Sequence, residues 1–113
     1  MIDESVRLAN ALIELLQARE LEKALALARG ARHLARSQDL ESRQLGVHEA
    51  TRGLVEARRI RERLLLQAET QPESQRAYAR EQLERICREL FDPQIAALQT
   101  RKRLLSRPHR VDS

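Results

Sequence analysis

The apolar residues of the first third of the chain recur at spacings of three and four, the pattern of a helix packed along one face. The stripe is formed by Ile2, Val6, Ala9, Ile13 and Leu16. Residues 3–36 contain no proline and only one glycine. The stripe changes phase after residues 17–20, where neither Gly nor Pro occurs, so we interpret the slip as a stutter within one long helix.

Turn-forming residues divide the rest of the chain. Ser, Gln, Asp and Glu gather in residues 37–42 and predict a tight reversal. The apolar repeat resumes in residues 40–69, which predicts a second helix antiparallel to the first. These two segments together predict a long helical hairpin.

A third helix is expected from residue 70 onward. Thr70 and Glu73 have the spacing of a capping box, and Pro72 suits the first turn of a helix. The dipeptide Asp92-Pro93 leaves two alternatives open. Either a short fourth helix begins there, or Pro93 only kinks the third helix.

No segment alternates with a period of two, so the predicted fold class is all-α. We expect a long antiparallel helical hairpin with one or two C-terminal helices packed on it, a three- to four-helix bundle. Residues 1–106 would form this single domain, and residues 107–113 a flexible basic tail. Since the seam is rich in Ala and the chain has one Phe and one Tyr, we expect a partner or a second copy to complete its apolar face.

The net positive charge of the chain comes from its C-terminal end. Lys and Arg number 21 against 17 Asp and Glu, a net charge of +4. Residues 94–113 hold five basic residues and one acidic residue, so they account for the whole excess. A neutral body argues against a broad nucleic-acid surface and leaves the tail as the basic element.

The sequence also predicts a cytoplasmic protein. Cys87 has no second cysteine to pair with, which suits a reducing compartment. Asp3 and Glu4 near the start do not resemble a secretory signal. No stretch has the roughly 18 uncharged apolar residues that a membrane span requires.

One charged residue interrupts the second helix. Arg61 lies between Leu54 and Ala68 where the repeat predicts an apolar residue. In the predicted hairpin it is within reach of Glu14 or Glu20, and a structural ion pair with one of them would fix the register. The alternative is that Arg61 lays its aliphatic stem along the edge of the seam.

Residue patterns for catalysis are missing from the sequence. Cys87 has no His nearby to act as a base. Gly30, Gly46 and Gly53 are isolated within helical patterns and form no phosphate loop. Metal-ligand spacing is not recognisable either. We therefore expect a non-enzymatic protein with no catalytic residues, no metal and no cofactor.

The leading functional hypothesis is an adaptor or chaperone that holds an amphipathic partner helix in an apolar groove. Pro93 sets apart a C-terminal segment that carries the only Phe, and we expect this segment to form the contact surface. Its residues are Leu90, Phe91, Ile95, Leu98 and Leu105, with Arg101 and Arg103 around them. The alternatives are a basic-tailed helical dimer that binds nucleic acid and a structural coiled-coil subunit that self-associates.

Two stretches of the chain resemble a known family. Residues 21–29 (LEKALALAR) and 90–98 (LFDPQIAAL), in a chain of this length with a long first helix, resemble the small all-helical export chaperones of flagellar and type III secretion systems, the FliT-like group. The resemblance implies a cytosolic, non-enzymatic bacterial protein that masks an aggregation-prone helix of a secretion client. It also implies that the C-terminal helices regulate access to that site.

Overall fold

The computed structural model of the chain describes residues 2–31 and 44–106, and every regular element within these ranges is helical. The predicted all-α class is therefore confirmed. The α-helices are α1 (Ile2–Gln17), α2 (Leu21–Gly30), α4 (Val47–Leu66), α5 (Glu73–Ile86) and α6 (Asp92–Ser106). A short 3-10 turn, Gln67–Thr70, lies between α4 and α5, and a π-helical turn, Cys87–Phe91, joins α5 to α6.

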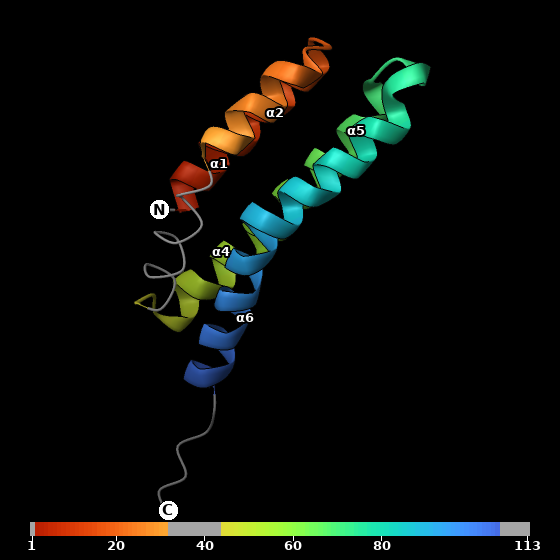
Figure 1. Ribbon diagram of the computed structural model, residues 1–113. Helices are drawn as coiled ribbons and strands as arrows, with labels where there is room; N and C mark the ends of the chain where they lie inside the picture. Colours follow the sequence, from red (N-terminus) through yellow and green to blue (C-terminus); the bar gives the residue numbers. More distant parts are fainter. Residues whose placement is uncertain (1, 32–43, 107–113) are drawn as a thin grey trace, which may run out of the picture.

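The helices form two hairpins of unequal length (Figure 1). In the shorter hairpin α2 runs back along α1, and in the longer one α5 and α6 form one continuous rod that runs back along α4. The shorter hairpin packs on the α5 end of the longer one, and we call this part the four-helix end. At the other end α6 packs on the first half of α4, and the long dimension reaches 61 Å.

The core is divided in the same way. The larger cluster fills the four-helix end, and its most deeply buried large side chains are Leu12, Leu16, Leu25, Leu64, Leu83 and Phe91. A smaller cluster between α4 and α6 consists of Leu45, Ala50, Leu54, Ala57 and Leu98, with Ile95 packed against it. Small side chains let α4 and α6 approach closely, but they bury little apolar area at that end.

The predicted single helix over residues 3–36 is wrong, because the chain reverses between α1 and α2. The Arg19 N–H donates to the Leu16 carbonyl at 3.0 Å, and the Glu20 N–H donates to the Leu15 carbonyl at 2.9 Å. These are the two bonds of a Schellman motif, with Arg19 at the left-handed position, φ 60°. Gly usually occupies this position, but this chain has Arg19 there. The sequence at the phase slip therefore gave no recognisable sign that the helix ends.

The remaining predicted boundaries can be compared with the starts of α4 and α5. The reversal expected at residues 37–42 lies outside the described residues, and α4 begins at Val47 after Gly46. The third helix starts at Glu73, later than predicted, because Pro72 is its N-cap residue and does not lie in its first turn. The expected capping box is not formed, because the Thr70 hydroxyl donates instead to the Gln67 carbonyl at 2.7 Å.

A fourth helix, α6, does begin at Asp92, which was one of the two alternatives for Pro93. A π-helical turn joins it to α5, so the two helices form one uninterrupted rod with a wide turn just before the proline. The Asp92 N–H donates to the carbonyl of Cys87, five residues back, which is the π-helical bond. In a regular α-helix the ring of Pro93 would clash with the carbonyl of Glu89, four residues back, and the wider turn relieves this. The buried stripe shifts by one residue there: it follows Ala79, Leu83, Ile86 and Leu90 and then continues at Gln94 and Leu98.

Two buried polar contacts hold α1 at both of its ends. Near the start of α1, the Ser5 hydroxyl donates to Gln94 Oε1 at 3.1 Å, and both residues are buried. At its end, the side-chain amide of Gln71 donates to the Leu16 carbonyl at 2.6 Å. A shift of α1 along its neighbours would break both contacts and take the donor from the buried Gln94 oxygen, so they help to fix the register of the two hairpins.

Arg19→Gly should stabilise the protein by about 1 kcal/mol, because a left-handed conformation costs a non-glycine residue about that much. Urea denaturation followed by circular dichroism measures the change. The matched control is Ala18→Gly, since Arg19 is the only non-glycine residue with positive φ among those described. Ala18→Gly should leave stability unchanged or lower it, and equal gains from both variants would contradict the assignment.

Ser5→Ala should destabilise the protein by about 1–3 kcal/mol, because it leaves the buried Gln94 amide oxygen without its donor. The double variant Ser5→Ala/Gln94→Leu should recover part of that loss, since replacing both partners removes the unsatisfied group. A double-mutant cycle by chemical denaturation gives the coupling. Strictly additive effects would show that the contact does not stabilise the fold.

Candidate functional site

The structure buries most of the apolar residues that the sequence assigned to a partner surface. Leu90 and Phe91 belong to the core of the four-helix end. Leu98 is 0% exposed between α4 and α6, and Ile95 is half-buried against the same cluster. These four side chains stabilise the protein's own fold, so in this conformation they offer no groove to a partner.

The end of α6 is the part of that predicted surface which remains accessible. Leu105 is 39% exposed, and Arg103 is also exposed. The Arg101 Nε donates to the Leu45 carbonyl at 2.7 Å, which ties the last turns of α6 to the residues before α4. Arg101 therefore has a structural contact of its own, while Arg103 and Leu105 face solvent.

Arg61 forms an ion pair between helices, as one hypothesis predicted, but with a different partner. Its Nε donates to Asp92 Oδ1 at 2.6 Å, and this hydrogen bond raises the pKa of Arg61 above its ordinary value. The expected partners Glu14 and Glu20 are wrong, and Glu20 pairs instead with Lys23 at 3.1 Å. The prediction assumed one long first helix, and the reversal after Gln17 removes the register on which it was based. The ion pair instead links α4 to the start of α6.

Cys87 lies beside this ion pair and is fully buried. Burial raises the pKa of its thiol to about 12; the Arg61 charge opposes this shift, while Asp92 and Glu84 add to it. The thiol therefore stays protonated at neutral pH and is a poor nucleophile. Its surroundings are those of a core residue.

Replacement of Cys87 by Ala should change the pH dependence of stability above pH 9. Below the ordinary thiol pKa of about 9 the thiol is protonated in both states, so the difference between wild type and Cys87→Ala is constant. Between about pH 9 and pH 12 the unfolded state loses the proton while the folded state keeps it. Wild-type stability should fall there by up to about 1.4 kcal/mol per pH unit relative to Cys87→Ala.

Urea denaturation of both proteins at a series of pH values gives this difference directly, because other titrating groups are common to both. A difference that stays constant from pH 8 to pH 11 would show that the folded thiol ionises normally.

α5 is flanked by an opening on each side, because few of its residues are buried. Ala79, Leu83 and Ile86 are the buried residues of this fourteen-residue helix. One opening lies between α5 and α4, and the other lies between α5 and α2. We call them the α4–α5 groove and the α2–α5 pocket.

The α4–α5 groove has a volume of about 460 Å³ and an apolar floor inside a charged rim. Leu66, which is 60% exposed, and the half-buried Leu65 form the floor. The rim consists of Arg58, Arg61, Glu62, Glu69, Arg80 and Glu84. Arg80 and Glu69 form an ion pair across the groove.

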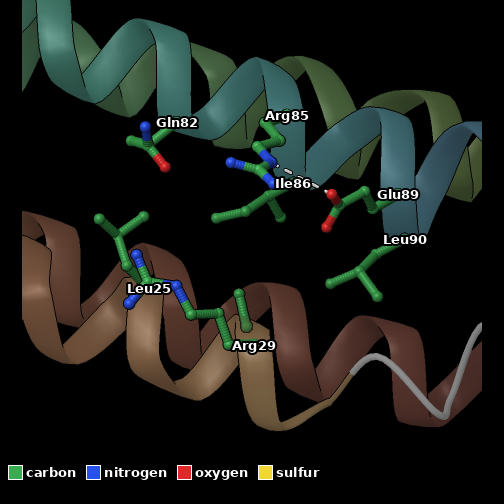
Figure 2. A pocket seen from close by; sticks show the side chains of 8 residues that line it. Leu25, Arg29, Gln82, Arg85, Ile86, Glu89 and Leu90 are labelled. Atoms are coloured by element: carbon green, nitrogen blue, oxygen red, sulfur yellow. Dashed lines mark hydrogen bonds and ion pairs between the residues drawn. The ribbon is translucent and has the colours of Figure 1, made fainter.

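The α2–α5 pocket is smaller, about 100 Å³, and is shown in Figure 2. Gln82 and Arg85 project from α5 towards α2, and Arg29 lies along α2 opposite them. The Arg85 Nε donates to Glu89 Oε1 at 3.2 Å. Apolar side chains form the rest of the lining: Leu25, Ala28, Ile86 and Leu90.

Neither opening was predicted from the sequence. The run Leu64, Leu65 and Leu66 does not by itself reveal which leucine faces solvent, and the phase of α5 depends on where α1 ends. A usable signal was the stripe at helical spacing within residues 58–69, which carries both charged residues and leucines.

Comparison with protein-family models, with curated proteins and with solved structures finds no match for this chain. Among the helices of residues 2–31 and 44–106, none is long and apolar enough to cross a membrane. The function is therefore inferred from the geometry of the openings beside α5.

Proposed function

We propose that this chain is a non-enzymatic adaptor that binds an amphipathic helix of a partner protein in the α4–α5 groove. The exposure of Leu66 supports this proposal most directly, because 60% of this large apolar residue faces water within the lining of the groove. Full burial of a leucine side chain contributes about 1.5–3 kcal/mol, so covering Leu66 and Leu65 would favour binding.

The shape of the groove suits a helix. Its residues recur at helical spacing from Arg58 to Leu66 on α4 and on to Glu69 in the following 3-10 turn, which corresponds to about 16 Å along the axis. A partner helix of about three turns would match this length. Such a helix would place apolar residues at spacings of three and four over Leu65 and Leu66.

The charges of the rim suit a partner that carries both signs. Three Arg and three Glu line the groove, so its net charge is zero. Arg61 and Arg80 are already paired, whereas Arg58, Glu62 and Glu84 make no ion pair with other described residues. A helix with acidic and basic residues beside its apolar stripe would complement this rim, and a polyanion such as nucleic acid would not.

The resemblance to FliT-like chaperones extends the proposal to the identity of the partner. An export chaperone would cover an aggregation-prone helix of a secretion client in the cytoplasm of a bacterium. The groove then replaces the C-terminal segment as the client site, because the core residues of that segment are buried. The expected homodimer remains a prediction and would compete for the same floor.

A photo-crosslinking residue in place of Leu66 should capture the partner in cells, because this position lies on the floor of the groove. Mass spectrometry of the product identifies the captured segment. A synthetic peptide of that segment should become helical on binding the purified full chain. Leu66→Glu should weaken this binding by at least about tenfold, because it places a charge in the apolar contact.

Val47 is the matched control, since it is an exposed apolar residue at the other end of α4. Neither a crosslinker at Val47 nor Val47→Glu should have these effects. Crosslinks from Leu66 only to a second copy of the chain would overturn the adaptor proposal. Nuclease-sensitive binding that falls steeply with salt and requires Lys102 and Arg103 would instead favour the nucleic-acid alternative.

A further inference from the structure

The side of α4 that faces away from the core carries a regular stripe of exposed residues. The stripe is formed by Val55, Arg59, Glu62 and Leu66. Their spacings of four, three and four place these side chains along one line of the helix. The two apolar members, Val55 and Leu66, are 53% and 60% exposed. The buried residues of α4 occupy the opposite face, so the stripe belongs to the outer surface of the fold.

The order of residue types in the stripe is complementary to itself when it is read backwards. From Val55 onward the order is apolar, basic, acidic and apolar. If a second copy of α4 lies antiparallel against the first, Val55 faces Leu66 of the second copy and Arg59 faces its Glu62. Both pairs are centred on the same point of the helix, so one alignment forms them together. The two-fold symmetry of such a dimer forms each contact twice.

From this pattern we infer that the chain forms an antiparallel homodimer in which the stripe of α4 packs on the same stripe of a second copy. Val55 and Leu66 make the apolar contacts, and the charged pairs set the direction and register. Neither Arg59 nor Glu62 forms an ion pair with another described residue, so both charges are available. A parallel dimer would place like charges opposite each other and is disfavoured.

Residues beside the stripe fit the same alignment. Glu56 directly follows Val55, and Arg63 directly follows Glu62, so both flank the stripe on one edge. The two-fold axis brings Glu56 of one copy near Arg63 of the other, where their charges attract. Neither of them forms an ion pair with another described residue of its own chain. This edge therefore adds a second complementary pair to the interface.

The dimer is expected to be weak and reversible, because two apolar side chains from each copy form only the centre of a standard interface. The inference does not rest on the proposed function, but Glu62 and Leu66 belong both to the stripe and to the α4–α5 groove. A second copy on the stripe would cover part of that groove. A partner helix would then have to displace the second copy, so self-association would limit access to the groove.

Charge reversal in the purified full chain tests this pairing. Wild type should dimerise in a concentration-dependent manner when it is followed by sedimentation equilibrium up to about 1 mM. Arg59→Glu would place carboxylates opposite each other, and Glu62→Arg would do the same with guanidinium groups. Each variant alone should dimerise at least about tenfold more weakly than wild type. An equimolar mixture of the two variants should associate about as strongly as wild type, because every carboxylate again faces a guanidinium.

Arg7→Glu is the matched control, because Arg7 is exposed on α1 and the change in net charge equals that of Arg59→Glu. It should leave dimerisation unchanged. The double variant Arg59→Glu/Glu62→Arg should dimerise like wild type, which keeps the test valid if a single variant folds poorly. The inference is overturned if wild type stays monomeric, if Arg59→Glu behaves like Arg7→Glu, or if neither the mixture nor the double variant recovers dimerisation.

The same variants separate this inference from the adaptor proposal. Arg59 lies outside the lining of the α4–α5 groove, so Arg59→Glu should still bind the captured peptide. Leu66→Glu should lose both the peptide and the second copy, because Leu66 contributes to both surfaces. A dimer that forms without any captured partner would leave the homodimer standing and the adaptor proposal refuted.

Discussion

The hydrogen bond from the Gln71 amide to the Leu16 carbonyl joins the two reversals of the four-helix end. Leu16 lies at the end of α1, and Gln71 lies between α4 and α5. Gln71 is only 1% exposed, and its amide also donates to the Gln67 carbonyl at 3.3 Å and to the Thr70 hydroxyl at 3.1 Å, so it ties the end of α1 to the 3-10 turn. The Ser5–Gln94 contact then sets the other end of α1. The relative position of the two hairpins, and with it the space on both sides of α5, depends on these contacts.

The openings on both sides of α5 follow from the weak burial of this helix. α1 buries a full face that includes Leu8, Leu12 and Leu16, whereas α5 inserts few residues into the core and presents polar side chains on either side. Its two flanks nevertheless differ in chemistry. The flank towards α4 has an exposed leucine and balanced charge, whereas the flank towards α2 has exposed arginines over apolar side chains that are almost fully buried. The side of α5 towards α4 is therefore the one that offers apolar area to a partner helix.

The sequence predicts the fold class and the position of most helices, because the spacing of apolar residues directly reflects the period of a helix. The sequence locates the phase slip of the apolar stripe at residues 17–20 but does not reveal the chain reversal there. Arg19 occupies the left-handed position where a Gly would have indicated a helix end. Arg61 was recognisable as a polar residue in an apolar seam, but its partner Asp92 depends on how the hairpins pack. The α4–α5 groove could not be predicted for the same reason, because the burial of Leu98 and the exposure of Leu66 are set by tertiary packing.

The π-helical turn acts as an inserted residue in the rod formed by α5 and α6. It lets the rod present one side to the large core before Cys87 and a side shifted by one residue to α4 beyond Phe91. Deletion of one residue here would regularise the helix and rotate α6 by about 100° relative to α5. Leu98 would then turn away from α4, and Gln94 away from Ser5. The length of this segment is thus more constrained than its composition, and homologues should tolerate substitutions in it more readily than insertions or deletions.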